Sequence, residues 1–99
     1  MATREERLAA NESFFREVNE EIERLTEGWA LESLRDFVCE CSDASCTQVV
    51  SMTLKEYRGV RAHRHRFAVV PGHELPEIET VVERHQRYLV VEKHAELAE

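Results

Sequence analysis

Apolar residues recur at intervals of three and four along the first part of the chain, which predicts a long amphipathic helix over residues 3–27. Thr3 and Glu6 have the spacing of a capping box at its start, and Gly28 is placed to end it with a left-handed cap. The apolar positions follow a heptad repeat that is interrupted by one polar residue, Asn11. This apolar stripe consists of Leu8, Phe15, Val18, Ile22, Leu25 and Trp29.

The apolar stripe is narrow and needs a partner surface, and two partners are compatible with it. In one interpretation the helix packs against its own domain. In the other it pairs with a second copy of the chain, and Asn11 helps to set the register of this homodimer. Phe14 lies beside the stripe and widens it, which slightly favours a broader partner surface. The stripe is therefore the candidate surface for self-association or for a protein partner.

The pattern then changes to an alternation of two residues, which is typical of strands. Phe37, Cys39 and Cys41 are spaced so that a strand places both thiols on one face. The next four residues, Ser-Asp-Ala-Ser, have turn chemistry, and residues 47–52 alternate again and are rich in β-branched side chains. We expect a hairpin with Cys46 at the end of its loop.

A second capping box begins a short helix in the middle of the chain. It consists of Thr53 and Glu56, and we expect the helix to end near Ala62. Residues 67–70 form an apolar strand that stops at a Pro-Gly turn dipeptide, and residues 88–92 form the last strand.

Residues 76–85 fit two different elements. Pro76 suits a first helical position, and acidic residues early with basic residues late in the segment favour a helix. A strand over 78–84 is the competing prediction, because β-branched residues cluster there. If residues 76–85 form the helix, the sequence predicts an α+β fold in which residues 1–99 are a single domain. A long N-terminal helix precedes a small zinc-stabilised sheet with two short helices, over residues 36–94.

Length and composition limit the functions to consider. Ninety-nine residues leave room for one core, and a net charge of −7 makes the chain a poor general binder of nucleic acids or anionic membranes. The charged first residues offer no signal-peptide core, and no apolar run approaches the roughly 20 residues that span a bilayer. We therefore expect a cytoplasmic protein with reduced thiols.

The candidate chemistry lies in three cysteines, an odd number that cannot pair off within one chain. Cys39, Cys41 and Cys46 place three soft ligands close together, and Zn²⁺ prefers four thiolate or imidazole ligands. His73 is the best fourth ligand, because a Pro-Gly turn at the end of a strand can aim a short side chain. The remaining histidines lie in charged or terminal surroundings: His63, His65, His85 and His94. We expect a structural Zn²⁺ on the three cysteines and His73.

Two other states of the cysteines stay open. The thiols can be small buried core residues, or Cys41 and Cys46 can form a disulfide that leaves Cys39 unpaired. Structural zinc supplies apparent free energies of about 10–16 kcal/mol to small folds, and a chain this short needs such a contribution. Three thiolates and one imidazole leave no open position for water, so the metal would stabilise rather than catalyse.

The expected function is that of a small interaction or regulatory protein with a structural zinc site, and not of an enzyme. One alternative is a thiol redox switch in which oxidation of the cysteines ejects the zinc. Another is a small zinc enzyme in which His73 and Glu74 act as an acid/base pair beside an open metal position. The sequence contains no phosphate loop and no zinc-protease motif that would favour catalysis.

A basic segment, Lys55–Arg66, lies within this acidic chain. Five basic residues against one acidic residue give it a charge of +4, which leaves −11 on the rest. An anion, an acidic partner or RNA can dock on such a segment, whereas the simpler interpretation is a solvated face balanced by the protein's own glutamates. A nucleic-acid-binding module is the weaker alternative, because exposed aromatic residues for base stacking are not interleaved with the basic ones.

Several of these motifs together resemble a set of short bacterial proteins with a similar pattern of cysteine and histidine. The motifs are Phe37-Val38-Cys39-Glu40-Cys41, Cys46, Thr53-Leu54-Lys55-Glu56-Tyr57 and Val70-Pro71-Gly72-His73-Glu74. The resemblance implies that the three cysteines and the histidine act as one unit, and it implies no particular activity.

Overall fold

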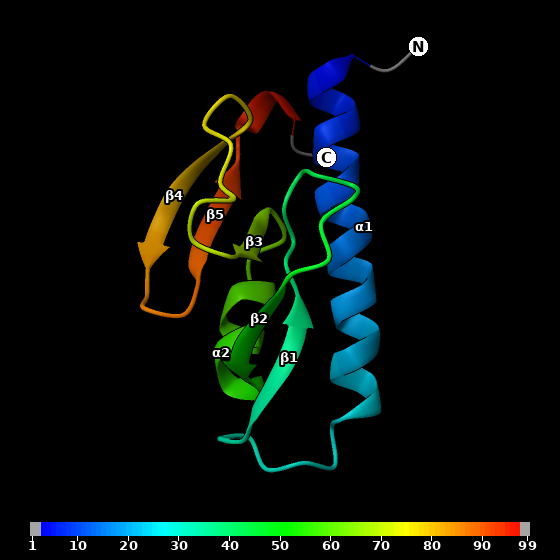
Figure 1. Ribbon diagram of the computed structural model, residues 1–99, viewed down its shortest axis with the longest axis vertical. Helices are drawn as coiled ribbons and strands as arrows, with labels where there is room; N and C mark the ends of the chain where they lie inside the picture. Colours follow the sequence, from blue (N-terminus) through cyan, green and yellow to red (C-terminus); the bar gives the residue numbers. More distant parts are fainter. Residues whose placement is uncertain (1–2, 98–99) are drawn as a thin grey trace.

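The structure, a computed structural model, describes residues 3–97, and its first element is the long helix α1 (Arg4–Leu25) (Figure 1). The predicted capping box is present at its start. The Thr3 hydroxyl accepts a hydrogen bond from the Glu6 N–H at 3.1 Å, and the Glu6 carboxylate accepts one from the Thr3 N–H at 3.1 Å. The predicted helix is therefore confirmed, with its start set by these two residues.

The end of α1 differs from the prediction by two residues. Thr26 caps the helix, because its backbone N–H and its hydroxyl both donate to the Ile22 carbonyl. Gly28 does not adopt the left-handed conformation, so it is not the cap. Neither α1 nor any other helix within residues 3–97 is both long and apolar enough to cross a membrane.

The predicted hairpin is present as a two-stranded antiparallel sheet. β1 (Leu34–Val38) pairs with β2 (Val49–Thr53), and Phe37 lies opposite Val50. Both of these side chains are buried, as the alternation requires. β1 ends one residue before Cys39, so the first two cysteines follow the strand instead of belonging to it.

The second capping box begins α2 (Leu54–Arg61) directly after β2. The Thr53 hydroxyl accepts from the Glu56 N–H at 3.0 Å, and the Glu56 carboxylate accepts from the Thr53 N–H at 2.9 Å. Three apolar side chains at helical spacing face the core: Leu54, Tyr57 and Val60. The short helix predicted here is confirmed.

A three-stranded antiparallel sheet completes the fold. β5 (Leu89–Lys93) lies in its centre, between β3 (Arg66–Val69) and β4 (Glu79–Arg84). A single turn of 3₁₀-helix, η1 (Ala95–Leu97), follows β5. Figure 1 shows this sheet beside the β1–β2 pair, with α1 along the other side of β1.

The helix predicted over residues 76–85 is wrong, and the competing strand over 78–84 is nearly right. β4 pairs with β5, with Val81 opposite Val91, and a bulge between Val81 and Glu83 shifts the register. The β-branched run gains cross-strand packing, and β5 gains a hydrogen-bonded neighbour on its second edge. These long-range contacts outweigh the local helix signals. Within residues 3–97 the α+β fold therefore has one short α-helix after the long one, not two.

The apolar core draws its buried residues mainly from β1, β2, α2, β3 and β5. Within it the rings of Phe37 and Tyr57 stack, with centroids 4.4 Å apart. Ile22 of α1 is only partly buried against this core. The core thus forms largely without the long helix.

α1 docks on the rest of the protein with a polar face. Three of its four buried residues are polar, and they lie on one side of the helix: Glu12, Asn19 and Glu23. The apolar stripe flanks this face, and its last members are exposed, Leu25 by 70% and Trp29 by 55%. The stripe is therefore not the most deeply buried face of the helix.

Candidate metal centre

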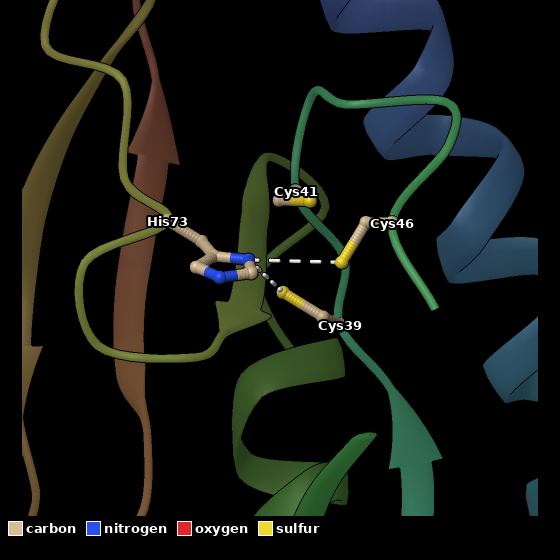
Figure 2. Close-up of side chains that lie close together, drawn as sticks. All are labelled: Cys39, Cys41, Cys46 and His73. Carbon is tan, nitrogen blue, oxygen red and sulfur yellow. Dashed lines mark hydrogen bonds between the residues drawn. The ribbon is translucent and has the colours of Figure 1, made fainter. Parts of the chain in front are cut away.

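The structure brings the four predicted ligands together (Figure 2). Cys39, Cys41 and Cys46 lie on the segment between β1 and β2, and His73 lies in the turn after β3. Each side chain offers one sulfur or nitrogen atom, and these four atoms all lie within 4.8 Å of one another. All three cysteines are free thiols, so the alternative disulfide is not present.

Backbone hydrogen bonds position the first two cysteines. The Cys39 N–H donates to the Gln48 carbonyl at 3.1 Å, which extends the pairing of β1 and β2 by one step. The Glu40 N–H donates to the Ala68 carbonyl of β3 at 2.8 Å, so this segment bridges the two sheets. Because an extended chain alternates its side chains, Cys39 and Cys41 face the histidine while Glu40 faces the core.

The third cysteine is positioned by the turn that the sequence predicted. The Asp43 carboxylate accepts from the Ser45 N–H at 2.9 Å and from the Ser45 hydroxyl at 2.7 Å. The Cys46 N–H donates to the Asp43 carbonyl at 3.0 Å. This Asx turn reverses the chain, and it brings the Cys46 sulfur back toward the first two cysteines.

A type II turn aims the histidine. The His73 N–H donates to the Val70 carbonyl at 2.9 Å, and Gly72 has a φ of 97°, which only glycine adopts easily. The Glu74 carboxylate accepts from the Gly72 N–H at 2.8 Å and holds the turn. The imidazole consequently presents its Nδ1 atom to the cysteine sulfurs (Figure 2).

Two of the six distances between the four candidate ligand atoms match those of a tetrahedral metal centre. With a Zn–S bond of about 2.3 Å and a Zn–N bond of about 2.0–2.1 Å, tetrahedral geometry separates sulfur from nitrogen by about 3.6 Å. The Nδ1 atom of His73 lies 3.5 Å from the Cys39 sulfur and 3.6 Å from the Cys46 sulfur. The residues present therefore fit a metal ion, with the imidazole bound through Nδ1.

The electrostatics of the cluster also suit a cation. The contact with Cys39 lowers the pKa of the Cys41 thiol to about 5, whereas the same contact, together with burial, raises the pKa of Cys39. Burial raises the pKa of the Cys46 thiol as well. The protein alone thus favours one thiolate at a time, because like charges this close repel each other. A divalent cation supplies the charge that three ionised cysteines need.

Glu40, between the first two ligands, is an important residue that the motif did not single out. Its carboxylate accepts three buried hydrogen bonds, from Asn19 Nδ2 at 2.9 Å, the Tyr57 hydroxyl at 2.8 Å and the Ala68 N–H at 2.8 Å. Burial raises the pKa of this carboxyl to about 7, although all three donors favour the charged form. The alternation of the sequence could have revealed the role of Glu40, because an extended segment that places both cysteines on one face places Glu40 on the opposite face.

Two asparagines of α1 contact the ligand-bearing segment. Asn19 Oδ1 accepts from the Val38 N–H at 2.7 Å, and its Nδ2 donates to the Val38 carbonyl at 2.8 Å. Asn11 Nδ2 donates to the Ser42 carbonyl at 2.8 Å. The heptad pattern gave Asn11 a role in setting the register of a homodimer. In the structure its side-chain amide instead forms a hydrogen bond within the same chain.

The basic segment is largely paired with acidic residues of the same protein. Arg58 and Arg61 each contact the Glu23 carboxylate of α1 at 2.8 Å. Arg66 pairs with Glu92 of β5 at 3.1 Å. This pairing supports a solvated face balanced by the protein's own glutamates, and it gives no support to a nucleic-acid surface.

Comparison with known proteins gives no match, whether to a family model, to a curated protein or to a solved structure.

Proposed function

We propose that this is a small zinc-binding protein in which Cys39, Cys41, Cys46 and His73 hold one structural Zn²⁺. The spacing of the ligand atoms carries the proposal, because sulfur-to-nitrogen distances of 3.5 and 3.6 Å are those of a tetrahedral zinc centre. Three sulfurs and one imidazole suit zinc rather than magnesium or calcium. A complete shell leaves no open position, so the metal stabilises the fold and does not itself catalyse a reaction.

Metal content and stability test this proposal. Protein purified without added metal should contain one zinc per chain by elemental analysis, and EDTA should lower its melting temperature. His73→Ala and Cys46→Ala should weaken zinc binding strongly. His85→Ala is the matched control, because this histidine contacts Glu83 and lies outside the cluster. Protein that takes up no zinc and melts at the same temperature with and without EDTA would sink the proposal.

The proposed role is interaction or regulation in the cytoplasm, where free thiols stay reduced. A second copy of the chain is the proposed partner, since the apolar stripe has the heptad spacing of a paired helix and its end is exposed at Leu25 and Trp29. The double variant Leu25→Glu, Trp29→Glu should be monomeric, and the wild type should have twice the monomer mass by light scattering. A folded monomeric wild type contradicts self-association.

A thiol redox switch at the same site is the second candidate. It is favoured by the exposure of Cys46, which is half-buried while the other two cysteines are buried. In such a switch one thiolate attacks hydrogen peroxide and breaks its O–O bond, which gives a sulfenic acid and one hydroxide ion. A second thiolate then forms the S–S bond and displaces the second hydroxide ion, so two thiolates and one peroxide give a disulfide and two hydroxide ions. Titration with hydrogen peroxide separates the candidates. A switch releases zinc while the sheets stay folded, whereas a purely structural site releases it only on unfolding.

A further inference from the structure

Polar contacts hold α1 against a core to which it adds little. The buried apolar cluster comes mainly from the sheets and α2, and α1 contributes the partly buried Ile22. Elements with few buried apolar contacts open locally at low free energy. In proteins most of the stability of a helix comes from its tertiary packing rather than from its own propensity. The helix therefore depends on the partners of its polar side chains.

One set of these partners lies on the segment that carries the first two ligands. The Asn19 side chain forms hydrogen bonds with both the N–H and the carbonyl of Val38, and its Nδ2 also donates to the Glu40 carboxylate. Asn11 holds the Ser42 carbonyl. These contacts lie directly before, between and directly after Cys39 and Cys41.

A second set of partners lies on α2 and the turn after it. The Arg16 guanidinium donates to backbone carbonyls of Arg61, His63, Arg64 and Arg66. The Glu23 carboxylate pairs with Arg58 and Arg61. Arg16 and Glu23 make these contacts away from the ligand-bearing segment, so they hold α1 independently of the metal ligands.

Alternation along the chain links the first set to the metal. In an extended segment the two sulfurs face His73 while the carboxylate of Glu40 faces α1 and α2. Fixing Cys39 and Cys41 on one ion therefore also fixes Glu40 and the neighbouring peptide groups. Without the ion, Cys39 and Cys41 lose this common anchor, and the asparagines lose partners held at a defined position.

We propose that metal occupancy of the cysteine–histidine site controls how firmly α1 docks on the rest of the protein. The inference rests on the proposed zinc site and adds a regulated element to it. Loss of zinc loosens α1, and the Arg16 and Glu23 contacts keep it tethered near α2. By thermodynamic linkage, contacts of α1 with the ligand segment must in turn strengthen zinc binding by the same factor.

Hydrogen exchange on the full chain tests the first half of the proposal. Amide protection is measured with zinc bound and after EDTA treatment, with the central strand β5 as the internal reference. We expect protection in α1 to fall about tenfold or more, a size typical of coupling between sites, while β5 changes less. Equal losses in α1 and β5, or no loss in α1, would overturn the proposal.

Zinc affinity tests the reciprocal half. Asn11→Ala removes only the bond to Ser42 and should weaken zinc binding measured against a chromophoric chelator, and Asn19→Ala should weaken it more. Coupling between sites typically amounts to roughly 5- to 150-fold. Arg24→Ala is the control, because Arg24 is an exposed residue of the same helix that pairs with Glu21.

The two proposals fail in different ways. If the wild type takes up no zinc, the proposed function itself is wrong. If zinc binds with equal affinity to the wild type and to Asn11→Ala and Asn19→Ala, the zinc site stands and its coupling to α1 is refuted. Because Asn11 is the partly buried member of the pair, its variant keeps the test informative if Asn19→Ala does not fold.

Discussion

Asn19 of α1 donates a hydrogen bond of 2.9 Å to the carboxylate of Glu40, which lies between two candidate cysteine ligands and 21 positions further along the chain. The same asparagine pairs with both peptide groups of Val38, as a neighbouring strand would, and so protects the edge of β1. The Glu40 carboxylate also accepts hydrogen bonds from the Tyr57 hydroxyl of α2 and from the Ala68 N–H of β3. One carboxylate thus joins three elements around the candidate metal centre.

Replacing this carboxylate should be costly. In Glu40→Gln the side chain keeps its shape, but an NH₂ group replaces one of the two oxygens that accept hydrogen bonds. Because this NH₂ group is itself a donor, at least one of the buried donors around residue 40 loses its acceptor. We expect a loss of about 1–3 kcal/mol in the free energy of unfolding by urea denaturation. Glu17→Gln, at an exposed position of α1, is the control and should change little. Equal stability of the two variants would contradict the role of Glu40.

The turn before His73 gives a prediction with a matched control. Gly72 has a φ of 97° and open space around its Cα, so Gly72→Ala adds conformational strain without a clash. We expect it to cost about 1–2 kcal/mol and to weaken zinc binding, because the strained turn displaces the imidazole. Gly59→Ala in α2, also in open space, should instead stabilise by about 0.5–1 kcal/mol and leave zinc affinity unchanged. Equal zinc affinities would show that the turn does not aim the ligand.

Local chemistry was enough to predict the candidate ligands. Cys39, Cys41 and Cys46 are close in sequence, and the turn that brings the third back to the others is visible as a polar four-residue segment. His73 follows a Pro-Gly dipeptide, which favours a type II turn because proline suits its second position and glycine its third. Such features depend on neighbours in the sequence, so a single sequence reveals them.

Long-range partners decided what the sequence did not predict correctly. The segment over residues 76–85 has helix signals at its ends, yet it forms a strand because β5 offers a free edge. On α1, the heptad pattern singled out the apolar stripe, whereas Asn19 and Glu23 are buried because their partners come from other elements. Those partners lie 19 and 35 positions away, which periodicity within one helix cannot show.

Glu12 of α1 should make stability depend on pH. Burial, and next the Glu79 carboxyl beside it, raises the pKa of Glu12 well above its ordinary value of 4.5, while Lys93 acts in the opposite direction. The folded protein therefore keeps Glu12 protonated at neutral pH, and the unfolded chain releases that proton above about pH 4.5. Because the folded state then binds more protons, this group destabilises the fold increasingly as pH rises.

Glu12→Gln removes this titration and should become more stable than the wild type as pH increases. The difference in unfolding free energy should grow by up to about 1.4 kcal/mol per pH unit between pH 6 and 8. Urea denaturation of both zinc-loaded proteins measures it, and the comparison at each pH cancels the pH dependence of metal binding itself. A difference that stays constant with pH would mean that Glu12 is ionised in the folded protein.

The order in which the three thiols react should follow access rather than acidity. Cys41 has the most acidic thiol, with a pKa lowered to about 5, but it and Cys39 are buried, whereas Cys46 is half-buried. An alkylating reagent must reach the sulfur, so burial outweighs thiolate character here. In brief labelling of EDTA-treated protein with iodoacetamide, mass spectrometry of the peptides should show Cys46 modified several times faster than the others. Bound zinc should slow all three reactions, and faster modification of Cys41 would show instead that its thiolate is exposed once the metal is removed.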